Sequence, residues 1–145
     1  MNLNEIEIVL VEDNLADAEL TIRALKDAHI MNNLIHLKNG EEALDFLYSR
    51  DAYVSRNANI HPKVILLDLR MPKISGIEVL REIKSDENLK SIPIVVLTSS
   101  TEDPDVQECY KLGVNSYISK PVEFNRFAEV VGQLGLYWLL LNTHV

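Results

Sequence analysis

Short, continuous apolar runs that alternate with helical patterns constrain this chain more than any other feature. The runs cover residues 6–11, 35–37, 64–67, 94–97 and 116–118. Between them, apolar residues recur every three or four positions, which is the spacing of one helix face. These helical stretches lie at 15–25, 41–49, 77–83, 104–112 and 123–141. The alternation predicts an α/β protein with a doubly wound, five-stranded parallel sheet and helices on both faces.

Turn and cap residues place some of the boundaries. Asn39-Gly40 ends the second run, and residues 49–62 read as a polar, irregular loop. Asp103 and Pro104 are typical of an N-cap and a first helical residue. Gly113 is the expected end of that helix.

Length and composition favour one domain over residues 1–145, with a core at 5–131 and a C-terminal helix and tail at 123–145. Cys109 is the only cysteine, so no internal disulfide is possible and we expect a cytoplasmic protein. The first residues do not resemble a secretory signal, and no apolar stretch reaches the roughly 20 residues that span a bilayer. The formal charge of −8 argues against nucleic acid as a partner.

Polar side chains follow the apolar runs at the points where the predicted strands end. Glu12-Asp13 follows the first run, Asp68 the third, Thr98 the fourth, and Lys120 comes shortly after the fifth. In an open parallel sheet, the carboxyl ends of the strands lie at one edge, where ligands bind. We therefore expect these side chains to converge, with Asp68 at the rim of the sheet rather than inside it.

Clustered carboxylates repel one another unless a cation is present. Mg²⁺ suits a site of one or two carboxylates, several waters and a phosphate oxygen. An aspartate can itself be the nucleophile that accepts a phosphoryl group. The side chains at this edge therefore suit an aspartate that is phosphorylated in the presence of Mg²⁺ (or Mn²⁺), with a lysine and a threonine beside it.

The residues that carry this chemistry resemble the receiver domain of two-component response regulators. The matching segments are VLVEDN (9–14), LLDLRMPKISG (66–76), VVLTSS (95–100) and YISKP (117–121), and the resemblance covers residues 5–140. It implies a flavodoxin-like sheet with strand order 2-1-3-4-5. It also implies a signalling protein that is not an enzyme, apart from its own phosphorylation and dephosphorylation.

The resemblance assigns a role to each site residue. Asp68 would accept the phosphoryl group from a sensor histidine kinase, and Thr98 and Lys120 would contact the phosphoryl oxygens. Asp13 would bind the metal directly and Glu12 through water, while Asp68 and the backbone carbonyl of Arg70 would complete the set of protein ligands. The remaining implied features are Thr98 and Tyr117 as switch residues, a cis Lys120–Pro121 bond, and control of the phosphate lifetime by Arg70 and Ser100.

Within the family, the chain resembles the small regulators that partner bacterial phytochromes. The segments concerned are EDNLADAEL, EALDFLY, EIKSDENLKSIPIVVLTSS and the Tyr137-Trp138-Leu139 tail. A homodimer through the fourth helix, fifth strand, fifth helix and this aromatic tail is one expectation, although the tail would equally serve as core. With no DNA-binding domain expected, output would pass through protein contacts, or the chain would relay its phosphate to another histidine protein.

Other functions fit the sequence less well. A haloacid-dehalogenase-like phosphatase needs an acid two residues after its nucleophile, where this chain has Arg70. In a flavodoxin-like electron carrier, Glu12-Asp13 would repel the flavin phosphate. Two site residues also have simpler interpretations: Tyr117 would be a packing residue in a strand, and Thr98 would only end a strand. Cys109 is expected to be a small, buried apolar residue.

Overall fold

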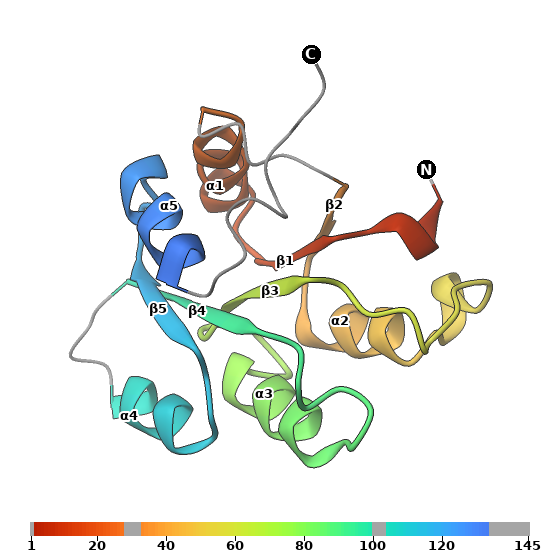
Figure 1. The fold of residues 1–145 in the computed structure, drawn as a ribbon. Coiled ribbons are helices and arrows are strands. Elements are labelled where there is room, and N and C mark those ends of the chain that lie inside the picture. The colour runs from red at the N-terminus through yellow and green to blue at the C-terminus, as the bar shows by residue number, and fades with distance from the viewer. Residues whose placement is uncertain (1, 28–32, 100–103, 134–145) are drawn as a thin grey trace.

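The computed structural model describes residues 2–27, 33–99 and 104–133. Within them, five parallel strands form one sheet in the order β2-β1-β3-β4-β5 (Figure 1). The predicted fold class and strand order are therefore confirmed. The strands are β1 (Ile8–Val11), β2 (Leu34–Leu37), β3 (Val64–Asp68), β4 (Ile94–Thr98) and β5 (Ser116–Ser119).

The helices of the described residues cover both faces of the sheet. On one face lie α1 (Leu15–Asp27) and α5 (Phe124–Gln133), and on the other lie α2 (Gly40–Leu47), α3 (Gly76–Ser85) and α4 (Pro104–Lys111) (Figure 1). Neighbouring parallel strands cannot be joined by a tight hairpin. The chain must cross over the sheet between them, and helices form these crossover connections.

Alternate residues of each strand feed two separate apolar cores. Val9, Ile65 and Val96 pack with α2, α3 and α4, whereas Leu66 and Val95 pack with α1 and α5. Neither face of the central strands meets water, and all of β1, β3 and β4 is buried. That is why their sequences are continuously apolar rather than alternating.

Local signals fix several helix ends. The side chain of Asn39 accepts a hydrogen bond of 2.8 Å from the backbone N–H of Glu42 at the start of α2. Gly113 has a φ of +92°, which glycine adopts at little cost, so the chain turns there after α4. The predicted stop is confirmed, while the predicted cap at Asp103 lies outside the described residues.

Some predicted boundaries are wrong. The first strand begins at Ile8 rather than at residue 6, and a short 3-10 helix, Leu3–Glu5, precedes it. The last helix begins at Phe124 and is described only as far as Gln133. The aromatic tail expected after it lies outside the described residues.

The segment 49–62 is more ordered than an irregular polar loop. It contains a 3-10 helix, Asp51–Tyr53, and buries Arg56, whose residue surface is only 5 % exposed. The Arg56 guanidinium donates to the carbonyls of Phe46 (3.0 Å) and Leu47 (3.4 Å), and it stacks 4.3 Å from the centre of the Phe46 ring. Since the last carbonyls of a helix have no partner within it, Arg56 caps α2 from this loop.

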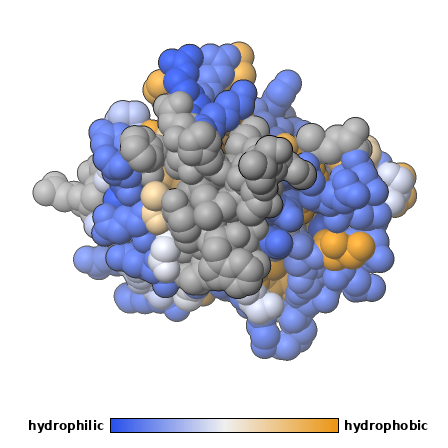
Figure 2. Space-filling model, turned by 45° about the horizontal axis from the view of Figure 1, so that its top comes forward, coloured by the Kyte–Doolittle hydropathy of each residue, from blue (hydrophilic) through white to orange (hydrophobic). Residues whose placement is uncertain are grey.

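A few large hydrophobic side chains of the described residues are exposed, namely Leu15, Leu20, Val54, Ile60 and Tyr110. Outside the residues drawn in grey, the face seen in Figure 2 is mostly hydrophilic, with small, separate hydrophobic areas. No helix in the described ranges has both the length and the apolar character required to cross a membrane.

Candidate functional site

The predicted site residues converge at one edge of the sheet. Glu12 and Asp13 directly follow β1, and Asp68 and Thr98 are the last residues of β3 and β4. Lys120 directly follows β5, and its backbone N–H donates to the carbonyl of Thr98 at 2.7 Å. The parallel topology thus brings together residues that are more than 100 positions apart.

Asp68 differs from the expectation in one respect. It does stand at the carboxyl end of its strand, but it belongs to β3 and is only 2 % exposed. The rim position therefore does not keep the carboxylate in water. Glu12 is also fully buried. Charges in such a place need partners, because isolated burial is costly.

Lys120 supplies that partner. Its ammonium Nζ lies 3.0 Å from Glu12 Oε1, 3.1 Å from Asp68 Oδ1 and 3.3 Å from Asp17 Oδ2. The Lys120 side chain is only 13 % exposed. The Lys120–Pro121 peptide bond that follows is cis, as predicted.

The charges at this edge shift one another's protonation. Burial, and then the hydrogen bond with Asp68, raise the pKa of Glu12 to about 7, although the nearby ammonium opposes this. Burial alone would lower the pKa of Lys120, but its hydrogen bond to Glu12 and the charges of Asp68 and Glu12 raise it above the usual value. The two acids thus favour the charged form of Lys120, whereas burial favours the protonated form of Glu12.

Asp17 and His36 belong to this site and were missed in the sequence. Asp17 lies in the first turn of α1, four residues after Asp13, where it reads as an ordinary acidic first turn. The ring Nε2 of His36, in β2, lies 2.7 Å from the backbone carbonyl of Glu12 and donates to it, since a carbonyl only accepts. His36 thereby helps to fix the backbone at Glu12.

A metal ion would find oxygen ligands here. One carboxylate oxygen from each of Glu12, Asp13 and Asp68 lies within 4.8 Å of the other two. Asp13 is exposed, whereas Glu12 and Asp68 are buried, so the cluster opens toward solvent on one side. A set of carboxylate oxygens with room for water fits a hard divalent cation such as Mg²⁺. The role of the Arg70 carbonyl stays a prediction.

Backbone contacts hold Asp68 from the side of α3. The backbone N–H of Arg70 donates to Asp68 Oδ1 at 3.3 Å, and that of Gly76 donates to the Leu69 carbonyl at 3.0 Å. A Cβ atom on Gly76 would lie 2.3 Å from the Asp68 carbonyl oxygen. Only glycine therefore fits where the start of α3 meets the end of β3.

The two predicted switch residues occupy different surroundings. Thr98 is 3 % exposed at the end of β4. Tyr117, in β5, is half-buried and packs against the core on the α2–α3–α4 side, with its ring edge-on to that of Tyr110 at 6.1 Å between centroids. Their roles as switches stay predictions. Cys109 is buried, as expected.

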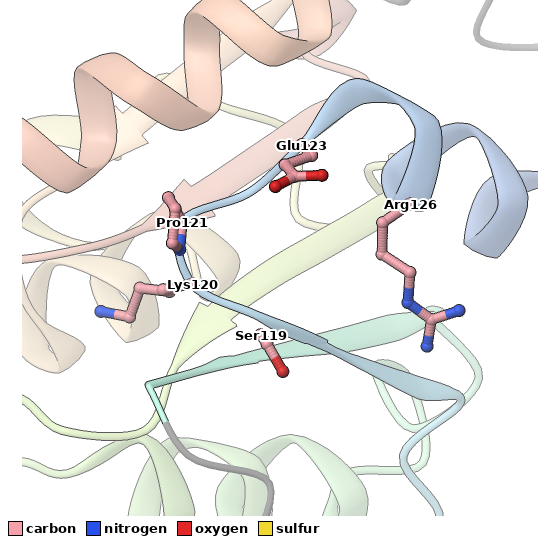
Figure 3. A pocket seen from close by; sticks show the side chains of 5 residues that line it. All are labelled: Ser119, Lys120, Pro121, Glu123 and Arg126. Carbon is pink, nitrogen blue, oxygen red and sulfur yellow. The ribbon is translucent and has the colours of Figure 1, made fainter.

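A hollow lies beside this edge, behind the end of β5. It is lined by Ser119, Lys120, Pro121, Glu123 and Arg126. In Figure 3 the Lys120 and Arg126 side chains do not point toward each other. Arg126 is occupied elsewhere, donating to the Tyr117 carbonyl at 3.3 Å and pairing with Glu129 at 3.1 Å. The hollow thus does not combine the two cations into one anion site.

Comparison with known proteins gives a consistent result. The sequence pattern of the response regulator receiver domain matches residues 8–132. The "Probable methanogenesis regulatory protein FilR2" of Methanothrix harundinacea is 42 % identical over 135 residues, covering 93 % of this chain and 84 % of that protein. Response regulator Rcp1 of Synechocystis sp. is 41 % identical over 132 residues, covering 91 % of this chain and 88 % of that protein.

Solved structures of response regulators are also similar to this chain. The bacteriophytochrome response regulator RtBRR superposes with a TM-score of 0.86 at 45 % identity, covering 94 % of this chain and 82 % of that one. The Mn²⁺-bound form of Rcp1 gives a TM-score of 0.74 at 39 % identity, covering 97 % of each chain.

Proposed function

The chain belongs to the response regulator receiver domain family of two-component signalling, and from this premise we propose that it accepts a phosphoryl group on Asp68 from a sensor histidine kinase. The observation that carries the proposal is the position of Asp68, buried at a strand end with the Lys120 ammonium 3.1 Å from its Oδ1. A structural aspartate does not need this cluster of acids around one lysine.

This geometry supports the following phosphoryl-transfer step. A carboxylate oxygen of Asp68 attacks the phosphorus of a phosphohistidine, an O–P bond forms, and the P–N bond breaks with its electron pair left on the imidazole. Lys120 and the Thr98 hydroxyl hold the equatorial phosphoryl oxygens, which carry most of the charge in such reactions. Asp13, Asp68 and the Arg70 carbonyl, with Glu12 through water, would hold Mg²⁺, which would supply charge neutralisation at the reacting oxygens when bound.

Phosphorylation then changes the protein surface. The acyl phosphate carries about two negative charges in place of the single charge of the Asp68 carboxylate, and it brings strong acceptor oxygens. Drawing Thr98 toward these oxygens shifts the end of β4 and opens space for the Tyr117 ring to turn inward. The face made by α4, β5 and α5 would change, and this face would serve for contact with targets or with a second copy of the chain.

The related proteins support a proposal for which type of histidine kinase donates the phosphoryl group. Rcp1 and RtBRR are response regulators, and the name of RtBRR refers to a bacteriophytochrome. We extend this to a cytoplasmic phytochrome-type histidine kinase as the phosphate donor. Onward transfer to another histidine protein is the alternative output. A phosphatase of the dehalogenase type is disfavoured, because Arg70 occupies the position of its second acid and pairs with Asp105 at 3.5 Å.

The test is intact mass after incubation with phosphoramidate and Mg²⁺, for wild type and Asp68→Asn. We expect a gain of one phosphoryl group in wild type only, lost when the metal is chelated. Asp45→Asn is the matched control, because Asp45 lies outside this edge of the sheet, in α2. An equal gain in Asp68→Asn, or no gain in wild type together with no binding of beryllofluoride, would refute the proposal.

A further inference from the structure

Arg70 connects the proposed phosphate acceptor to α4. Its backbone N–H donates to Asp68 Oδ1 at 3.3 Å, while its side-chain Nη1 lies 3.5 Å from Oδ2 of Asp105, in the first turn of α4. The side chains of this pair are 63 % and 39 % exposed. One residue thus contacts the buried acid through its backbone and the helix through its charge.

We propose that the Arg70 guanidinium exchanges Asp105 for the phosphoryl oxygens on Asp68, and that this exchange releases the first turn of α4. The inference rests on the proposed function, since it assumes that Asp68 is the acceptor. It adds a direct electrostatic connection between the phosphate and α4, in addition to any movement of Thr98 and Tyr117.

The energetic balance favours the exchange. An ion pair as exposed as Arg70–Asp105 contributes little, because water screens it. Phosphorylation replaces the single charge of the buried Asp68 carboxylate with about two charges on the phosphoryl oxygens, at a site where charges interact more strongly than in water. A guanidinium also matches the geometry of phosphate oxygens, with two parallel hydrogen bonds. Phosphorylation therefore offers Arg70 a stronger partner within reach of its flexible side chain.

The part of α4 around Glu108 keeps contacts that do not involve Arg70, because Cys109 is fully buried in the core there. Arg81, in α3, pairs with Glu108, one turn further along α4. Arg81 lies in the middle of α3, away from the loop that contacts Asp68. This pair persists when Arg70 changes partner. We therefore expect the start of α4 to move while the region around Glu108 stays attached to α3.

The experiment measures beryllofluoride affinity with saturating Mg²⁺, by titration of the α4 amide resonances in ¹⁵N-labelled protein. The variants are Asp105→Asn, Arg70→Gln, the double variant and Glu108→Gln. Arg70→Gln keeps the backbone carbonyl that is predicted to bind the metal. Glu108→Gln is the matched control, because it removes the same charge from the same helix but breaks the pair with Arg81.

The proposal predicts a specific set of affinities. Removing the competitor in Asp105→Asn should tighten beryllofluoride binding about two- to fivefold at low salt, the amount that an exposed ion pair supports. Arg70→Gln should weaken binding, and in its presence Asp105→Asn should have no further effect. At high salt, wild type should approach Asp105→Asn, since screening weakens the exposed pair first.

Three results would overturn the proposed exchange of Arg70 from Asp105 to the phosphoryl oxygens. An unchanged affinity in Asp105→Asn, an equal change in Glu108→Gln, or a full effect of Asp105→Asn in the Arg70→Gln background would each show that Arg70 does not exchange partners. In all three cases wild type would still bind beryllofluoride and Asp68→Asn would not. Failure of the inference is therefore separate from failure of the proposed function, which would appear as no binding in wild type.

Discussion

Replacing Gly76 with alanine should destabilise the protein, although the same change usually stabilises a helix. A Cβ on Gly76 would lie 2.3 Å from the Asp68 carbonyl oxygen and 2.6 Å from the Leu69 Cα. Both atoms are backbone, so they cannot move aside as a flexible side chain would. Overpacking of this kind costs about 1–3 kcal/mol, and the upper end applies here. Alanine regains up to about 1 kcal/mol of helix propensity, which leaves a net loss of about 2 kcal/mol.

Gly132 provides the matched control. It lies in α5, and its added Cβ would meet nothing within 4 Å. Gly132→Ala should therefore gain about 0.5–1 kcal/mol. Urea unfolding followed by far-ultraviolet circular dichroism measures both free energies of unfolding. In a thermal scan the loss at Gly76 corresponds to roughly 4–8 °C. The reasoning fails if Gly76→Ala is as stable as wild type while Gly132→Ala is stabilised as expected.

Three further predictions concern Glu12, Arg56 and Cys109. The pKa of Glu12 is raised from 4.5 to about 7 by burial and by its hydrogen bond with Asp68, so the folded state keeps this proton longer than the unfolded state. The Glu12 contribution to the free energy of unfolding of the metal-free protein should therefore decrease as pH rises from 4.5 to 7. The free energies of unfolding of wild type and Glu12→Gln, measured with urea, should change differently with pH over this window. The same pH dependence in both proteins would contradict the raised pKa of Glu12. Arg56→Met removes the Arg56 hydrogen bonds to the Leu47 carbonyl and to the Phe46 carbonyl, the latter of which keeps the Ser49 N–H, and should cost about 1–3 kcal/mol. Arg50→Met, which removes an exposed pair with Asp45, should cost under about 1 kcal/mol, and equal losses in urea unfolding would count against the cap. The buried Cys109 thiol should react with a thiol reagent only as fast as the protein opens, so fast labelling of the native protein would show that its helix is loosely packed.

The sheet and most of the site could be predicted because both follow from local sequence. An apolar run that ends in an acid, a hydroxyl or a lysine identifies a strand and its exit, and parallel topology places the exits together. Asp68, Thr98 and Lys120 were found in this way. Their burial was not, because exposure at a strand end depends on how the neighbouring loops cover it.

The contacts that the sequence did not predict depend on how a helix is rotated about its axis and on the course of a loop, and sequence patterns do not encode either. Asp17 reaches Lys120 only because α1 presents that side of its first turn to the end of β5. His36 reaches the Glu12 carbonyl because β2 lies next to β1 at the edge of the sheet. Arg56 appeared to be an ordinary charge in a polar loop, and its burial follows from the course of that loop back across the end of α2.

The position of Lys120 among Glu12, Asp68 and Asp17 has a consequence for metal binding. The protein carries one counterion of its own, so part of the negative charge of the cluster is offset before any metal binds. A divalent cation would therefore bind carboxylates of which two, Glu12 and Asp68, already pair with an ammonium, and this pairing lowers the affinity that a metal titration would measure. The resident ammonium also lets the site keep its shape when magnesium is scarce, ready to take up the ion without refolding.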